Sequence, residues 1–264
     1  MLQPNLFISY INSDDHKSSN TKGYALSTDD VIIYTLYLPE YNDLTKDLIH
    51  FLNLEESKRA ERYYKENDRN QFIICRAILK FVLAAHTKLD VTTINLDYHF
   101  NKKPFLASHP WIHFNVSHSV DFAVIAISRN MVGIDIEHVS EDFDFTPLLP
   151  DIFNDNEVLT IQNAENQEYA FYSSWTRKEA FVKALGKGID EDFKNIPCLN
   201  GQYSIDPALL KTNENWQVYG FDLAEGYLGA IVFESLPTIS KNLSIRTLPK
   251  TVKELREITQ LKDN

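Results

Sequence analysis

Cysteines, glycines and long apolar runs are scarce in this sequence of 264 residues. The only cysteines, Cys75 and Cys198, lie far apart and form no Cys-x-x-Cys pair, which argues against a disulfide framework and a cysteine-based zinc site. Eight glycines occur, and neither Gly-x-Gly-x-x-Gly nor Gly-x-x-x-x-Gly-Lys-Ser/Thr is present. No run of about 18 apolar residues exists. We therefore expect no glycine-rich phosphate loop and no membrane span.

Positive charge is also in short supply. The chain carries 26 Lys and Arg against 37 Asp and Glu, a formal net charge of -11. Nucleic-acid phosphates require a basic surface, so we expect no nucleic-acid partner. The first residues lack a basic segment followed by a long apolar run, so no signal peptide is expected. These features predict a cytoplasmic protein.

Aromatic residues are plentiful, with 16 Phe and 13 Tyr, enough for a sizeable core. Apolar periodicity predicts alternating strand and helix segments in an α+β fold of two related halves. We expect a turn at Arg129-Asn130 that joins the flanking apolar runs in a hairpin. The predicted divisions are a polar N-terminal arm (1–30), an N-terminal subdomain (31–110), a C-terminal subdomain (111–235) and a C-terminal tail (236–264).

Two carboxylates stand on one predicted strand, VGIDIE at 132–137. Asp135 and Glu137 are two residues apart and therefore point to the same face. Neighbouring carboxylates repel one another unless a cation or a base lies between them, and carboxylate oxygens suit a hard ion such as Mg²⁺. The same spacing also fits an ordinary solvated strand face.

A second feature is WTRKEAFVKALGKG at 175–188, which reads as a helix that ends at its glycines. Glu179 and Lys183 are four residues apart, so both can face one site and hold a metal and a phosphate together. The alternative is a surface ion pair of the usual helical spacing.

The third feature is FNVSHS at 114–119. Ser117 and His118 are adjacent on a predicted strand and so face opposite sides, which is the wrong geometry for a serine–histidine nucleophile pair. Contact with an anion is the better interpretation, because both side chains can donate hydrogen bonds. A structural histidine is the alternative.

The order and spacing of these three motifs resemble the signature of the phosphopantetheinyl transferase superfamily, in its Sfp-type branch. Two segments of the first half are similar to that branch as well: ESKRAERYYKENDRNQFIICRAILKFVL (56–83) and NKKPFL (101–106). The resemblance extends from about residue 31 to about residue 234. It departs from the family at Asn101 and Lys102, where that loop usually carries glycine.

The resemblance implies two similar α/β subdomains in a pseudo-twofold arrangement, with coenzyme A bound between them. It implies a monomeric, magnesium-dependent transferase that moves 4'-phosphopantetheine from coenzyme A to a serine of an apo acyl or peptidyl carrier protein and releases 3',5'-ADP. The implied roles are Asp135, Glu137 and Glu179 for Mg²⁺, Lys183 for the phosphates, Ser117 and His118 for the nucleotide, Lys103 for the adenine and ribose end, Arg59 and Arg76 for the 3'-phosphate, and Glu157 as a base or further metal-site residue.

Either Glu179 or Glu157 could accept the proton of the carrier serine. Three lysines are candidates for a basic patch that docks an acidic carrier helix: Lys178, Lys187 and Lys194. A solvated lysine face is the alternative. Two other functions remain open: a phosphodiesterase that uses the same carboxylates with water as nucleophile, and a module that binds coenzyme A or a carrier without turnover.

Overall fold

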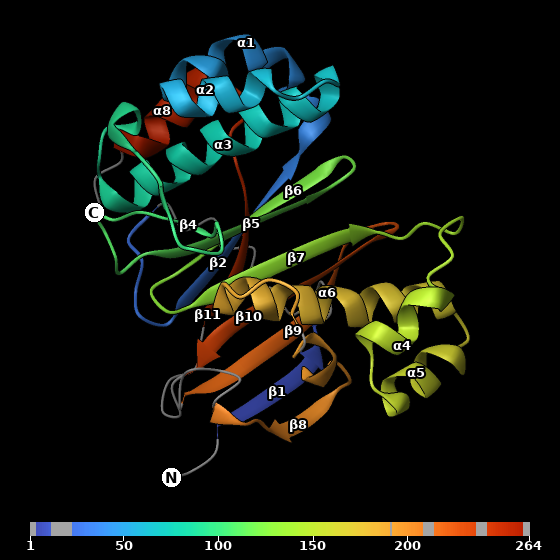
Figure 1. The fold of residues 1–264 in the computed structure, drawn as a ribbon. Coiled ribbons are helices and arrows are strands. Elements are labelled where there is room, and N and C mark those ends of the chain that lie inside the picture. The colour runs from blue at the N-terminus through green and yellow to red at the C-terminus, as the bar shows by residue number, and fades with distance from the viewer. Residues whose placement is uncertain (1–3, 12–22, 191, 208–213, 236–241, 261–264) are drawn as a thin grey trace.

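The computed structural model describes residues 4–11, 23–190, 192–207, 214–235 and 242–260. Figure 1 shows two twisted sheets that lie one above the other, each covered on one side by a long helix. The first sheet has the strand order β7-β10-β9-β1-β8, and the second has the order β11-β2-β6-β5. The α+β class with two sheet-containing halves is therefore confirmed.

The strands of the first sheet are β1 (Asn5–Tyr10), β7 (Val132–His138), β8 (Gly201–Ser204), β9 (Asn215–Ala224) and β10 (Tyr227–Ser235). Those of the second sheet are β2 (Asp30–Tyr37), β5 (His113–Ser119), β6 (Phe122–Ser128) and β11 (Asn242–Thr247). A two-stranded hairpin pairs β3 (Asp97–Tyr98) with β4 (Pro104–Phe105).

The helices are α1 (Thr45–Leu48), α2 (Leu54–Glu61), α3 (Glu66–Thr87), α4 (Leu149–Ile152), α5 (Asp155–Gln162), α6 (Gln167–Leu185) and α8 (Val252–Gln260). α3 and α8 pack together on the second sheet, and α6 packs on β7 and β10 of the first. Short 3-10 turns occupy 38–44, 49–51, 91–93, 146–148 and 193–195. No helix in the described part of the chain combines the length and apolarity needed to span a bilayer.

The N-terminal strand lies in the sheet of the second half, and the C-terminal strand lies in the sheet of the first half. The predicted subdomain boundaries do not include this arrangement. Residues 5–10, placed in a loose arm, form β1, and their alternation buries Leu6 and Ile8 between β9 and β8. β11, placed in the tail, pairs in parallel with β2. β5 and β6, placed in the C-terminal subdomain, share the sheet of β2. Each sheet thus collects strands from both ends of the sequence.

The predicted hairpin at Arg129-Asn130 is wrong. β6 pairs with β2 and β5, whereas β7 pairs with β10 in the other sheet. The chain therefore crosses between the sheets at 129–131 instead of folding back on itself. Local turn signals describe the bend but not the partner of each strand, because the partner is chosen by tertiary packing.

A buried ion pair anchors the long helix of the first half. Asn53 and Glu56 form a reciprocal capping box at the start of α2. Glu56 Oε2 also lies 2.6 Å from Nζ of Lys80, which projects from α3 and donates to the carbonyl of Phe51 at 3.0 Å. Both side chains are almost fully buried. This arrangement has a counterpart in the second half.

Candidate functional site

The two sheets meet at their edge strands, β5 and β7, which are joined through side chains. Alternate residues of β5 face β7, because side chains alternate along a strand. Three N–H groups of β7 donate to them: Ile134 to Asn115 Oδ1 (2.9 Å), Ile136 to Ser117 Oγ (3.4 Å) and His138 to Ser119 Oγ (3.0 Å). The edge amides of β7 thereby have hydrogen-bond partners. We call this interface between β5 and β7 the seam, and the carboxylates of Asp135 and Glu137 lie in it.

Asp135 is the buried centre of this seam, with 2% of its surface exposed. Its Oδ1 accepts hydrogen bonds from Ser117 Oγ at 2.8 Å and from Lys183 Nζ at 2.5 Å. Glu137, two residues further along β7, accepts from Ser119 Oγ at 3.1 Å. The structure therefore brings together the predicted pair on β7 with Lys183 of α6.

The pKa values of three carboxyl groups are raised at this place, in each case chiefly by burial. Burial raises the pKa of Asp135, against the influence of Lys183. Burial and then the charge of Asp135 raise the pKa of Glu137. Glu179 of α6 is half-buried, and its pKa is raised by burial, with the charges of Asp135 and Glu137 adding to the effect. The site holds more negative charge than Lys183 alone balances.

These residues fit a divalent cation by their chemistry. Oδ2 of Asp135 is buried and has no hydrogen-bond partner, so one oxygen in the seam is unused. Oxygen ligands of this kind suit Mg²⁺. In the described part of the chain, no three His, Cys, Asp or Glu side chains already stand in a ligand arrangement. Instead, Lys183 places its ammonium against Asp135, where it offsets part of the charge.

A cavity of about 460 Å³ lies between α3 and the face of β5 that points away from β7. Arg59, Arg76 and His118 all line it, so the structure brings together three of the residues predicted to hold the nucleotide. His118 points away from Ser117, as the alternation of the strand requires. Burial, and then the nearby charge of Lys183, lower the pKa of His118.

The two arginines are arranged around one aromatic ring. The guanidinium carbon of Arg59 lies 5.0 Å from the ring centre of Phe72, and that of Arg76 lies 5.7 Å from it. Nη1 of Arg76 is buried without a hydrogen-bond partner, and its nearest carboxylate oxygen, on Glu56, is 3.7 Å away. A buried guanidinium donor that is left unused is suited to an anionic ligand.

Ser117 and Lys103, both predicted to contact the nucleotide, form hydrogen bonds with other protein groups. The Ser117 hydroxyl donates to Asp135 and accepts from Lys183 Nζ at 3.1 Å and from the backbone of Ile136. Its one donor and two acceptor positions are therefore all used. Lys103 Nζ donates to three backbone carbonyls, and burial lowers its pKa to about 8. In this structure the polar atoms of both side chains are bonded to protein groups.

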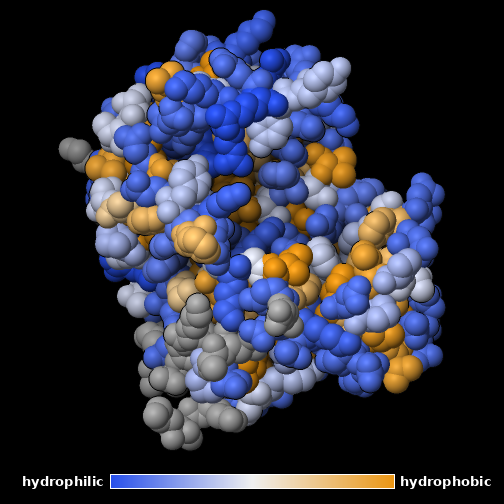
Figure 2. All heavy atoms as spheres, viewed as in Figure 1, coloured by the Kyte–Doolittle hydropathy of each residue, from blue (hydrophilic) through white to orange (hydrophobic). Residues whose placement is uncertain are grey.

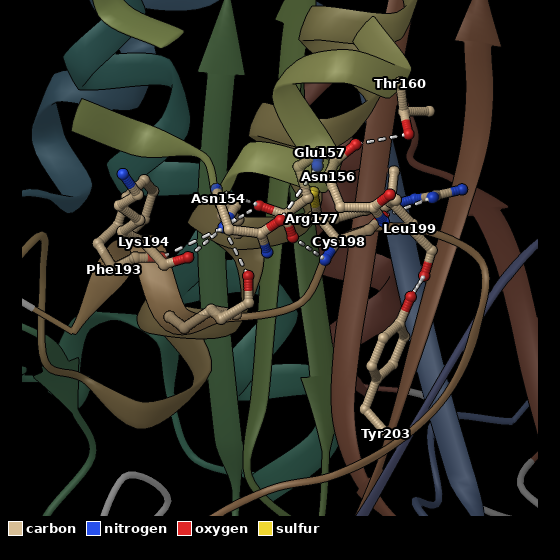
Figure 3. A network of polar contacts seen from close by, with 12 residues as sticks. Asn154, Asn156, Glu157, Thr160, Arg177, Phe193, Lys194, Cys198, Leu199 and Tyr203 are labelled. Atoms are coloured by element: carbon tan, nitrogen blue, oxygen red, sulfur yellow. Dashed lines mark hydrogen bonds and ion pairs between the residues drawn. The ribbon is translucent and has the colours of Figure 1, made fainter. Parts of the chain in front are cut away.

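Glu157 lies in a separate buried network and is not brought to the seam (Figure 3). It forms a capping box with Asn154, and its Oε2 lies 2.9 Å from Nζ of Lys178. Its Oε1 accepts from the backbone N–H of Cys198 at 3.1 Å, and Lys178 also donates to the carbonyl of Ile196 at 2.6 Å. This network repeats the Asn–Glu–Lys arrangement of the first half. Both carboxylate oxygens of Glu157 are used within this network.

The lysine patch predicted for docking is also not assembled. Lys178 is fully buried in the network of Glu157, because its ammonium is the partner of that carboxylate. Lys194 donates to the carbonyl of Pro150 at 2.8 Å, and Lys187 lies 3.5 Å from Asp192. On a helix that mixes polar and apolar residues, the sequence alone does not show whether a lysine is buried or solvated.

An apolar pocket that the sequence did not predict lies beside the seam. It has a volume of about 230 Å³, and its lining includes Glu137, Phe143, Leu148 and Trp175. Phe143 and Leu148 are more than one-third exposed. Figure 2 shows a mostly hydrophilic face on which hydrophobic side chains gather over the α4–α5 side. The aromatic residues around 143–153 were the available signal, but nothing in their spacing pointed to the carboxylates.

Two family models match most of the chain. Residues 131–232 match the 4'-phosphopantetheinyl transferase superfamily, and residues 38–130 match the N-terminal part of a 4'-phosphopantetheinyl transferase. The two matches meet at 130/131, where the chain crosses between the sheets.

Relatives match over much of their length. The 4'-phosphopantetheinyl transferase gsp of Aneurinibacillus migulanus is 32% identical, over 82% of this chain and 92% of the relative. HetI of Nostoc sp., another 4'-phosphopantetheinyl transferase, is 30% identical over 73% of this chain and 83% of its own. Sfp of Bacillus subtilis is 27% identical, over 69% and 86%. With its carboxylate seam and arginine pocket in one chain, this protein belongs to the 4'-phosphopantetheinyl transferase superfamily and is an enzyme of its Sfp-type branch.

Proposed function

We propose that this enzyme transfers the 4'-phosphopantetheine moiety of coenzyme A to a serine hydroxyl of an apo acyl or peptidyl carrier protein. The observation that carries the proposal is the pairing of the carboxylate seam with the arginine-lined cavity on the other side of β5. A coenzyme A molecule has its phosphates at two places, a 3'-phosphate and a pyrophosphate. The chain offers guanidinium groups for one and a lysine with three carboxylates for the other.

The reaction requires a nucleophile, a leaving group and a proton acceptor. The serine oxygen forms a bond to the β-phosphorus of coenzyme A, the bond from that phosphorus to the bridging oxygen breaks, and 3',5'-ADP leaves with the electron pair. Glu179 accepts the serine proton, directly or through water, because its carboxylate is partly exposed and lies close enough to Asp135 and Glu137 for their charges to raise its pKa.

Asp135, Glu137 and Glu179 would hold Mg²⁺, which would supply charge stabilisation at the pyrophosphate oxygens. Lys183 donates to Asp135 through Nζ and is 30% exposed, so its ammonium can also turn toward a phosphate. Arg59, Arg76 and His118 orient the nucleotide. Ser117 and Ser119 hold the two carboxylates of β7 in place through their hydroxyls.

The apolar pocket beside Glu137 supports a carrier protein as acceptor. A surface that is apolar at its centre and adjoins the reacting groups is typical of a protein docking site. It replaces the lysine patch in our proposal, and it explains how a chain with a net charge of -11 can receive an acidic partner. We also propose that the enzyme acts as a monomer, since one chain supplies both sides of the site.

The test is transfer measured by mass. The protein is mixed with Mg²⁺, coenzyme A and an apo carrier protein, and the carrier is weighed with and without EDTA. A gain of one phosphopantetheine that EDTA abolishes supports the proposal. Coenzyme A cleavage that proceeds without any carrier would indicate a phosphodiesterase. Binding of coenzyme A with no product across acyl and peptidyl carriers would indicate a binding module.

A further inference from the structure

The loop between β3 and β4 reaches from one half of the molecule to the helix of the other. Its Lys103 is partly buried, and Nζ donates to the carbonyls of Lys183 at 2.7 Å, Ala184 at 2.9 Å and Val132 at 3.2 Å. An ammonium group has three N–H donors, so all of them are used. The side chain is a link between three backbone segments.

The three acceptors belong to the two elements that carry the candidate site. Lys183 and Ala184 lie in the last turn of α6, where the helix dipole is negative. The carbonyl of Lys183 also accepts from the N–H of Gly186 at 3.3 Å. Val132 is the first residue of β7, three residues before Asp135. A cation at this place is favoured by the dipole, and it fixes the end of α6 to the start of β7.

Asn101 in the same loop extends the link. Its Nδ2 donates to the carbonyls of Gly186 at 2.8 Å and Lys187 at 3.1 Å, just past the end of α6. On the other side, Pro104 follows Lys103 directly and lines the cavity of Arg59 and Arg76. One short segment therefore contacts both the arginine cavity and the helix that carries Glu179 and Lys183.

We propose that Lys103 is a positioning residue that fixes the last turn of α6 against β7, and thereby sets Lys183 against Asp135, without contacting the nucleotide. The proposal rests on the proposed function for its kinetic consequence, but not for its structural one. Without Lys103, the carbonyls of Lys183, Ala184 and Val132 each lose a hydrogen bond in a partly buried place, and the carbonyl of Lys183 keeps only the N–H of Gly186. The last turn of α6 then loosens, and the ammonium of Lys183 is no longer held at the seam.

The experiment compares Lys103→Met with Lys102→Met. Lys102 is the adjacent, exposed lysine, so the control removes the same charge from the same loop. We expect Lys103→Met to lower kcat at saturating coenzyme A at least about tenfold, because misplacing a reacting group by about 1 Å can cost on the order of a hundredfold. The Kd for coenzyme A, measured by calorimetry, is expected to change less than about twofold in both variants. Lys103→Arg, which keeps donors for the carbonyls, should retain more of kcat than Lys103→Met.

Hydrogen exchange of the backbone amides in α6 supplies a readout that does not depend on turnover. Exchange at residues 180–187 should be faster in Lys103→Met and unchanged in Lys102→Met. The two proposals can fail separately. If exchange differs between the two variants as expected but wild type transfers nothing to any carrier, the proposed function is contradicted and the positioning role is supported. If Lys103→Met does not fold, Asn101→Ala tests the same link, with faster exchange at the end of α6 expected.

Two results would overturn the positioning role. A Kd for coenzyme A that rises tenfold or more in Lys103→Met, with kcat at saturation unchanged, would make Lys103 a nucleotide ligand. Unchanged exchange in α6 together with unchanged kcat would show that the link does not position anything.

Discussion

Gly133 of β7 and Ala180 of α6 approach so closely that a Cβ atom on Gly133 would lie 2.1 Å from the carbonyl oxygen of Ala180. It would also lie 2.3 Å from the backbone nitrogen of Ala184. Both obstacles are main-chain atoms, which cannot turn aside as a side chain can. The missing side chain of Gly133 therefore lets α6 lie directly on β7, and this contact sets Glu179 and Lys183 opposite Asp135 and Glu137.

Replacing Gly133 with alanine should displace the helix from the strand. We expect the free energy of unfolding to fall by about 3 kcal/mol, because the added methyl group overpacks against main chain. Carrier modification should fall further than stability alone explains, since Lys183 moves with the helix. Chemical denaturation and the carrier mass assay measure the two effects. Gly23→Ala is the matched control, because nothing lies within 4 Å of its Cβ position. Unchanged stability in Gly133→Ala would contradict this account of the seam.

Mg²⁺ should raise the melting temperature of the wild-type protein, because it would neutralise Asp135, whose charge raises the pKa of both Glu137 and Glu179. Asp135→Asn should lose this effect. Lys183→Met should respond more strongly than wild type, since it leaves Asp135 without the ammonium that lies 2.5 Å away. Thermal scans with increasing MgCl₂ measure the response, and CaCl₂ and NaCl serve as controls for ion size and ionic strength. An equal response in wild type and Asp135→Asn would count against a cation in the seam.

Glu157→Gln should lower the stability of the fold, whereas Glu179→Gln should abolish transfer. Glu157 and Lys178 are both nearly fully buried, so removing one charge leaves the other unpaired, at a cost of about 3 kcal/mol or more. Glu179 is only partly buried, and its substitution should leave stability nearly unchanged while abolishing transfer. Denaturant midpoints and the mass assay give the two results. A stable Glu157→Gln variant without transfer would return Glu157 to the list of candidate bases.

His86 should make the fold sensitive to acid. Its Nε2 lies 2.9 Å from the hydroxyl of Tyr34, and burial lowers its pKa to about 4. Unfolded His86 binds a proton near pH 6.5, so its contribution to stability is present above that pH and is lost as the pH falls toward 4. Over this range, His86→Gln should gain on wild type by roughly 3 kcal/mol. Unfolding free energies at pH 7, 5.5 and 4 would show the trend, and a constant difference would exclude it.

The residues of the seam could be predicted from the sequence better than the architecture around them. Strand spacing paired Asp135 with Glu137 and helix spacing paired Glu179 with Lys183, because both spacings are local properties of the chain, and the family resemblance joined the two pairs. Long-range pairing is not local, so β1 was hidden in a segment assigned to an arm. The hydrogen-bond partners of the lysine side chains also could not be predicted from the sequence. Lys103 satisfies three carbonyls and Lys178 is buried, although each looks like any other lysine in the sequence.

Arg59 and Arg76 should discriminate between coenzyme A and 3'-dephospho-coenzyme A. Both line the cavity beside His118, and Nη1 of Arg76 lacks a hydrogen-bond partner, so a phosphate there would gain charge-assisted hydrogen bonds. Removing one such bond costs about 1.5–3 kcal/mol, so Arg59→Met or Arg76→Met should raise KM for coenzyme A at least about tenfold. KM for the dephospho donor should barely change, because it lacks the group that the arginine binds.

Arg69→Met is the matched control for this comparison. Arg69 projects from α3, the helix that carries Arg76, but it pairs with Glu66 at 3.9 Å and does not line the cavity. Its KM for both donors should equal that of wild type. Equal losses for the two donors in Arg59→Met and Arg76→Met would mean that the arginines support the shape of the cavity and do not bind the 3'-phosphate. A loss confined to coenzyme A would assign that phosphate to the arginine cavity, and the pyrophosphate would then be left for the seam.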